Sequence, residues 1–288
     1  MSSPPPDAWA GRTAVLATLH GKEAAIAPVL ARFTGLRVAV PDGFDSDRFG
    51  TFSRDIPRAG SALDAARAKI AAGFACRPDA TVGLASEGSF GPHPALPFVP
   101  LGTELVLLVD RTHGLELAGW HRAPAPYARG ERVTSLEAAH ALAARMGFPA
   151  QGLIALAMAD GAPAPRHGLH KALDTPTALD AAVAHELAAR GEAWLETDLR
   201  AHRYPPRMRR IRRAALALVR ACRSRCLACG RPGFVPAVAV PGLPCGWCLR
   251  PTALPRAHRM RCDGCGHEAE QPAKRAQADP AHCDHCNP

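Results

Sequence analysis

Cysteine spacing is the feature that most restricts how this chain can fold. Eight of its ten cysteines form four Cys-x-x-Cys pairs near the C-terminal end. These pairs are Cys226/Cys229, Cys245/Cys248, Cys262/Cys265 and Cys283/Cys286. Two residues between thiolates allow a tight turn that presents both sulfurs to one ion, and two such turns complete a tetrahedral site that zinc usually occupies. The spacing therefore predicts two structural zinc ions.

The spacing also bears on which pairs combine. The gaps between successive pairs are 15, 13 and 17 residues, and the first and third gaps fit the ribbon spacing Cys-x2-Cys-x15–20-Cys-x2-Cys. We therefore expect the first pair to combine with the second, and the third with the fourth. The interleaved arrangement, first with third and second with fourth, stays open. Gly230 and Gly266 each follow the first pair of an expected set, where a knuckle turn often needs a positive φ.

Disulfides and iron–sulfur clusters also use paired cysteines, and four-cysteine iron–sulfur ligation remains an alternative to zinc. Disulfides need an oxidising compartment, but the N-terminal segment MSSPPPDAW lacks the basic start and apolar core of a signal peptide. No apolar run of about 18 residues predicts a membrane span. We therefore expect a cytoplasmic protein with no membrane partner. The nearby histidines that could substitute as ligands are His258, His267, His282 and His285.

Positive charge is concentrated in one segment of the chain. The formal net charge is +9, and ten arginines but no acidic residue occur from Arg200 to Arg225. Such a run attracts phosphate, so a nucleic acid is one expected partner, the alternative being a solvated basic helix face. The cysteine-rich tail offers only Phe234 and Trp247 for stacking on bases, which weakens the nucleic-acid interpretation.

Four parts are expected along the chain. Residues 1–10 form a disordered leader, 11–198 an α/β body, 199–224 an Arg-rich helical linker, and 225–288 a zinc-ribbon module with two four-cysteine sites. Alternating strands and helices in the body favour an α/β fold with a mixed, largely parallel sheet flanked by helices. Strands are predicted at 12–19, 36–40, 81–85, 103–110, 114–122, 152–158 and 192–197, and helices from about 23 to 33 and at 61–73, 135–146, 177–190 and 206–222. A capping box of Ser61 and Asp64 marks the start of the second helix.

Ligands of open α/β sheets bind at the carboxyl ends of strands, and three polar segments fall there. The first is a strand-to-helix turn with His20 and Lys22, suited to an anion because a helix begins beside it. The second is a predicted loop at 86–94 with Glu87, a candidate Mg²⁺ ligand or base, and His93. The third, at 166–171, gathers basic and imidazole groups around a phosphate. Its candidate ligand-binding residues are His167 and Lys171.

An acidic loop at 41–53 could add oxygen ligands for Mg²⁺ through Asp45 and Asp47, or could be a solvated loop without a ligand. We expect Glu87, Lys22, His20 and His93 to be catalytic if the body is an enzyme. In that hypothesis the lysines neutralise phosphate charge and a histidine orients or protonates the substrate.

Two resemblances extend this interpretation. The segments ATLHGKE at 17–23, GTF at 50–52, SEGSFGPHP at 86–94 and ETDLRAHRYPPRM at 196–208, running into the cysteine pairs, resemble a bacterial family catalogued as a domain of unknown function. Residues 13–175 remotely resemble the inosine triphosphate pyrophosphatase superfamily. That resemblance places Thr18, His20 and Lys22 at a phosphate-gripping turn and Lys69 on the following helix. It also places Glu87 at the position of an acid that binds Mg²⁺.

The pyrophosphatase resemblance departs from the superfamily pattern in four places. The first turn is one residue short, His20 replaces an asparagine, Glu87 replaces an aspartate, and the late basic motif at 167–171 differs. The resemblance implies a nucleotide-binding body that hydrolyses a nucleoside triphosphate with Mg²⁺. The alternative function is a nucleic-acid-binding or protein-interaction module that uses the zinc ribbons and the Arg-rich helix.

Overall fold

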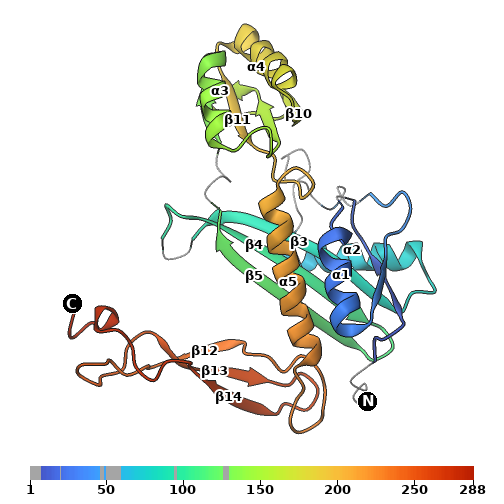
Figure 1. Ribbon diagram of the computed structural model, residues 1–288, viewed down its shortest axis with the longest axis vertical. Helices are drawn as coiled ribbons and strands as arrows, with labels where there is room; N and C mark the ends of the chain where they lie inside the picture. The colour runs from blue at the N-terminus through green and yellow to red at the C-terminus, as the bar shows by residue number, and fades with distance from the viewer. Residues whose placement is uncertain (1–7, 20, 46–48, 50–59, 94–95, 126–129) are drawn as a thin grey trace. The chain divides into compact units, whose positions relative to one another are not determined.

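The computed structural model describes residues 8–19, 21–45, 49, 60–93, 96–125 and 130–288 (Figure 1). Several predictions made above fall outside these residues: His20, Asp47, the GTF segment at 50–52 and most of the expected leader. The chain divides into two compact units, Trp9–Val219 and, at the other end, Arg220–Pro288. No helix in the described ranges is long and apolar enough to cross a membrane.

A five-stranded mixed sheet with the order β2-β1-β3-β4-β5 forms the first part of the larger unit. β1 (Thr13–Leu16) pairs in parallel with β2 (Arg37–Ala39) and with β3 (Val82–Pro92). β4 (Pro100–Asp110) is antiparallel to β3 and to β5 (Leu115–Pro124). This arrangement confirms the predicted α/β class with a mixed sheet flanked by helices.

Two helices of this part begin and end as their sequences suggest. α2 (Ala62–Cys76) starts at the predicted capping box, where Asp64 N donates to Ser61 Oγ and Ser61 N donates to Asp64 Oδ2. α1 (Glu23–Thr34) ends at Gly35, whose φ of 69° gives the left-handed cap that glycine adopts without strain. Both helices connect strands of the parallel part of the sheet.

The two faces of this sheet are covered by different helices. Ile70 and Phe74 of α2 pack on one face with Leu105 and neighbouring apolar residues. The other face carries α1 and α5 (Pro205–Arg223), as Figure 1 shows. A Cβ atom at Gly119 of β5 would overlap the backbone of α5 at Ala214 and Leu218. The helix backbone therefore rests directly on the strand.

The predicted loop at 86–94 is wrong, because β3 continues through it to Pro92. Its glycines and prolines suggested turns, but β4 pairs with every residue of β3 to its end. β1 pairs with β3 only as far as Leu84. Beyond that point one side of β3 has no partner strand within the sheet, a setting in which proline is tolerated. Glu87 and Ser89 are therefore strand residues with fixed faces.

A second, antiparallel sheet with the order β10-β7-β11-β6 completes the larger unit. It consists of β6 (Glu131–Val133), β7 (Leu153–Leu156), β10 (Leu169–Leu173) and β11 (Ala193–Thr197). α3 (Leu136–Arg145) and α4 (Pro176–Arg190) pack on it through a core that includes Leu142, Leu153 and Leu195. β8 (Met158–Ala159) and β9 (Ala162–Pro163) form a short hairpin beside β7.

The smaller unit is built on a three-stranded antiparallel sheet with the order β12-β13-β14. The strands are β12 (Val238–Pro241), β13 (Pro255–Arg261) and β14 (Glu268–Pro272), and a short 3-10 helix, η2, covers Pro280–His282. Phe234 packs between Cys226 and Cys262 as the centre of a small buried cluster. Few other large apolar residues are buried here, so the cysteine sites carry much of the stabilisation.

Candidate functional site

Each Cys-x-x-Cys pair forms the same kind of knuckle turn. The backbone N–H four residues after the first cysteine donates to its carbonyl: Gly230 to Cys226 at 2.8 Å and Gly266 to Cys262 at 2.9 Å. Both glycines have positive φ, of 72° and 74°, as predicted. Leu249 occupies the equivalent position after the second pair with a φ of 61°, a conformation that few leucines adopt.

The knuckles bring the eight thiols into two sets of four. One set is Cys226, Cys229, Cys262 and Cys265, and the other is Cys245, Cys248, Cys283 and Cys286. Neighbouring Sγ atoms from different pairs lie 3.5–3.9 Å apart. A tetrahedral zinc ion with bonds of about 2.3 Å separates its sulfurs by about 3.8 Å. The two sets therefore fit one zinc ion each, and none of the ten cysteines forms a disulfide in this structure.

The expected order of pairing is wrong: the sites are interleaved, with the first pair joining the third and the second joining the fourth. The reason is the antiparallel sheet. The start of β12 lies beside the end of β13, since Val238 pairs with Arg259, and this brings the first and third knuckles to one end. The ends of β12 and β14 lie at the other end, together with the second and fourth knuckles. Gap lengths alone carry no information about these strands.

Other possible ligands and thiols lie outside the two sets. The four histidines of the tail are absent from both, and His267 instead packs on Phe234 with ring centroids 5.5 Å apart. Cys76 is exposed. Cys222 is buried, and burial raises its pKa to about 12, so its thiol is unreactive.

The larger unit contains a second candidate site, a cluster of buried charges that we call the charged cluster. Its members are Lys22, Lys69, Glu87, Glu104 and Arg207, all at most 6% exposed. Lys69 of α2 is ion-paired with Glu87 of β3. Arg207 of α5 binds Glu104 of β4, with Nε 2.6 Å from Oε1. The cluster therefore links helices on both faces of the first sheet to its central strands.

Lys22 is the cluster member without a carboxylate partner in the described part of the chain. It stands just before α1, and its Nζ donates to the carbonyl oxygen of Ser86 at 2.9 Å. Burial is the main cause that lowers the pKa of Lys22 to about 7, and the positive charges of Arg207 and Lys69 lower it further. Lys22 therefore titrates near neutral pH, which is common at functional sites.

Two buried hydroxyls belong to residues near the point where β1 stops pairing with β3. Thr18 follows β1 and Ser86 lies on β3, and neither Oγ1 of Thr18 nor Oγ of Ser86 has a hydrogen-bond partner among the described residues. They are 3% and 1% exposed. Native proteins rarely leave such groups unsatisfied, so each one calls for a bound water, ion or ligand.

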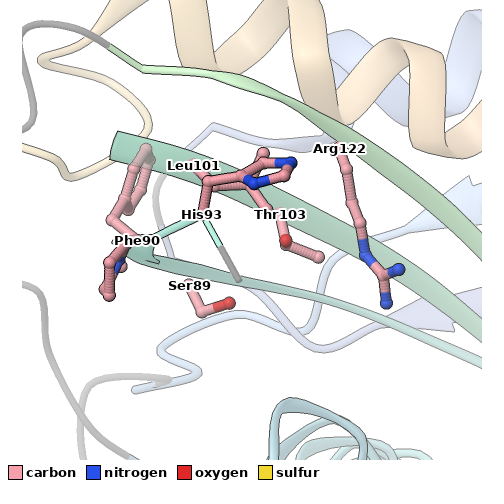
Figure 2. A pocket seen from close by; sticks show the side chains of 8 residues that line it. Ser89, Phe90, His93, Leu101, Thr103 and Arg122 are labelled. Carbon is pink, nitrogen blue, oxygen red and sulfur yellow. The ribbon is translucent and has the colours of Figure 1, made fainter. Parts of the chain in front are cut away.

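Ser89 and His93 line a separate cavity of about 530 Å³ on β3, β4 and β5 (Figure 2). Ser89 pairs with Thr103 and Thr103 with Arg122, so these three side chains form one row across the strands. Figure 2 shows them projecting to the same side of the sheet. Neither Lys22 nor Glu87 lines this cavity, and the predicted catalytic group is thus divided between the cavity and the charged cluster.

The remaining predicted residues lie elsewhere. Asp45 is exposed in the segment after β2. Lys171 belongs to β10 of the second sheet and His167 lies in the turn before it, whereas Glu87 belongs to the first sheet and Lys22 lies in the turn after β1. The structure therefore does not place these groups on one sheet edge as a shared phosphate site.

Glu104 and Arg207 were missed as members of a site. In the apolar strand TELVLLVD, Glu104 is the only acid apart from the last residue. A lone buried acid usually needs a cation beside it. That signal was present in the sequence. Arg207 was hidden among ten arginines, and only the fold distinguishes it from the exposed Arg209, Arg212 and Arg213.

Comparison with known proteins identifies the family and leaves its activity open. A family model described as "Domain of unknown function (DUF6671)" matches residues 77–288, which is well over half of the chain, and the protein belongs to this family. No curated protein matches the sequence.

Proposed function

We propose that this DUF6671 protein binds a phosphorylated small molecule, with a phosphate group at Lys22, Thr18 and Ser86. The observation that carries the proposal is the buried ammonium of Lys22, whose partner in the described structure is the carbonyl oxygen of Ser86, together with the unsatisfied buried hydroxyls of Ser86 and Thr18. A phosphate would accept hydrogen bonds from all three groups.

The charge of the cluster supports an anionic ligand. Three cations, Lys22, Lys69 and Arg207, face two carboxylates, Glu87 and Glu104. When Lys22 is protonated, the cluster thus carries one positive charge in excess. A buried excess charge is costly, and an anion bound there removes that cost. α1 also begins beside Lys22, and the N-terminus of a helix favours negative charge.

A nucleoside triphosphate pyrophosphatase-like reaction is the more specific form of this proposal. It is favoured by the meeting of Lys22, Lys69 and Glu87, three of the residues on which the resemblance to the pyrophosphatase superfamily rests. In this form, Mg²⁺ would bind Glu87 and polarise the phosphoryl oxygens. Glu87 is held by Lys69 in this structure. Loading of Mg²⁺ therefore requires Lys69 to move onto the phosphate.

Calorimetry with inorganic phosphate, pyrophosphate and a panel of nucleoside triphosphates tests the binding proposal. We expect Lys22→Met to weaken binding at least tenfold. Lys274 is an exposed lysine of the smaller unit, and Lys274→Met should leave binding unchanged. Absence of binding by the wild type, or equal binding by Lys22→Met, contradicts the proposal. Loss of binding in Arg122→Met alone would place the phosphate in the cavity of Figure 2 instead.

Turnover is tested separately. With Mg²⁺ and the same triphosphates, pyrophosphate release by the wild type should be lost in Glu87→Gln and retained in Glu137→Gln, a variant at an exposed acid of α3. Binding without turnover would support the proposed phosphate site and contradict the proposed hydrolytic reaction.

Nucleic-acid binding is the second candidate function. The exposed Arg209, Arg212 and Arg213 of α5 favour it, and Trp247 of the second knuckle is 77% exposed. Phe234 is buried and is therefore unavailable for stacking on a base. Five other arginines of the run contact the protein itself: Arg200, Arg203, Arg207, Arg210 and Arg225. A nucleic acid would thus meet about half of the charge that the sequence suggests.

A further inference from the structure

His170, His185 and Glu186 lie together where α4 packs beside β10, far in sequence from every cysteine knuckle. His170 is on β10, whereas His185 and Glu186 are consecutive residues of α4. His170 Nε2 is 2.8 Å from Glu186 Oε1, and the two imidazole rings have centroids 5.4 Å apart. One ligand atom from each of the three residues lies within 4.8 Å of the others.

Glu186 is held in place by the surrounding structure. Its side chain is buried, and a Cβ atom at Gly168 would lie 2.5 Å from its Oε1. Residue 168 must therefore be a glycine for this carboxylate to reach His170. Oε2 has no hydrogen bond within the described residues, and Arg190 Nη1 stands 3.8 Å from it. A buried carboxylate with an unsatisfied oxygen points to a bound ion or water.

We propose that His170, His185 and Glu186 form a third metal site, which binds a divalent transition ion such as zinc. Two imidazoles and one carboxylate are the donor set that such ions prefer, whereas Mg²⁺ and Ca²⁺ prefer oxygen ligands alone. Bonds of about 2.0–2.2 Å would place the three ligand atoms about 3.4 Å apart. To reach this spacing, His170 and Glu186 need to move slightly apart. The exposed His185 side chain needs to turn towards them.

The arrangement differs in kind from the cysteine sites. Its three protein ligands leave a coordination position open to solvent, because His185 is exposed, whereas each cysteine set supplies four thiolates. Arg190, with Nη1 3.8 Å from Oε2, helps to orient the carboxylate towards the ion. An ion in this site could therefore bind water or a small ligand in addition to the protein.

Cobalt titration of the full chain, with zinc already bound to both cysteine sets, tests this proposal. We expect one further Co²⁺ to bind with visible d–d absorption and without the sulfur-to-cobalt charge-transfer band that thiolate sites produce. His170→Gln, His185→Gln and Glu186→Gln should each weaken this binding at least tenfold. His140→Gln is the matched control, because His140 also faces an acid, with Nε2 2.8 Å from Asp180 Oδ1, but has no third ligand beside it.

His185→Gln keeps the test decisive if Glu186→Gln fails to fold, because the exposed His185 side chain contributes little to the core. Uptake that His185→Gln leaves unchanged, or uptake seen only with the charge-transfer band, overturns the proposal. Absence of a further Co²⁺ in the wild type overturns it as well.

Discussion

Arg207 and Glu104 form a fully buried ion pair between α5 and β4, 103 residues apart in sequence, with Nε 2.6 Å from Oε1. Arg207 Nη1 also donates to the carbonyl oxygen of Leu199 at 2.7 Å. The pair holds α5 against the first sheet. α5 is the helix that leads out of the larger unit.

Removing one partner of this pair should be strongly destabilising. We expect Arg207→Met to lower the free energy of unfolding by about 3–5 kcal/mol, because Glu104 would be left buried without a cation. The double variant Arg207→Met/Glu104→Met should be more stable than Arg207→Met alone. Chemical denaturation of the four proteins measures the coupling, and additive effects would show that the pair does not act as a unit.

Lys22 should make stability depend on pH. Its folded-state pKa of about 7 lies below the ordinary value of 10.5, so the unfolded chain binds more protons between these two pH values. The free energy of unfolding should therefore rise by a few kcal/mol from pH 7 to pH 10, relative to Lys22→Met. Below pH 7 the difference between the two proteins should be constant and should favour the variant. Identical pH profiles would contradict a buried, perturbed Lys22.

The same pKa sets the pH dependence of the proposed phosphate binding. Phosphate binds the protonated lysine and raises its pKa, so affinity should be highest below pH 7 and fall as pH rises above it. Calorimetry in buffers of different ionisation enthalpy should detect proton uptake near pH 7.5. If binding is independent of pH and no proton is taken up, the phosphate does not bind at Lys22.

Gly119 should not tolerate a side chain. Its missing Cβ leaves room for the backbone of α5 at Ala214 and Leu218, so Gly119→Ala should lower the free energy of unfolding by about 1–3 kcal/mol or more. Gly91→Ala on β3 of the same sheet is the matched control, because a Cβ atom there meets nothing within 4 Å. Thermal unfolding compares the two variants, and equal losses would argue against this close packing.

The interleaved cysteine sites can be distinguished from the in-order arrangement by two double variants. Cys229→Ser/Cys262→Ser removes ligands from one site and should retain half of the cobalt charge-transfer absorption of the wild type. Cys229→Ser/Cys248→Ser damages both sites and should retain almost none. In-order pairing predicts the reverse of these two results.

The prediction of the elements was good where local sequence governs them and poor where tertiary pairing does. Ser61 and Asp64 set the start of α2 through contacts within one turn, so the capping box could be predicted from sequence. The extension of β3 through Ser89 to Pro92 depends on β4, which overrides the turn preference of glycine and proline. A single sequence does not indicate how far a partner strand extends.

The candidate sites were likewise predictable only where their residues follow from local sequence. The eight cysteine ligands follow from their spacing, whereas their pairing follows from which ends of β12, β13 and β14 meet. Lys22 could be proposed from its place in the turn between β1 and α1, whereas Glu87 was proposed at the end of a strand that in fact continues to Pro92. Arg207 could be singled out from the other arginines only when the fold brought it beside Glu104. Likewise, His185 could be joined to His170 only once α4 was seen to pack beside β10.

The interleaving of the two cysteine sites has a consequence for how this module can be inherited. A break between Cys248 and Cys262 would leave the first two pairs on one segment and the last two on the other, so each segment would hold half of each site. Genetic recombination at that point cannot produce two single-zinc domains from this module. The tail is therefore one evolutionary unit, which can be gained, lost or transferred only as a whole.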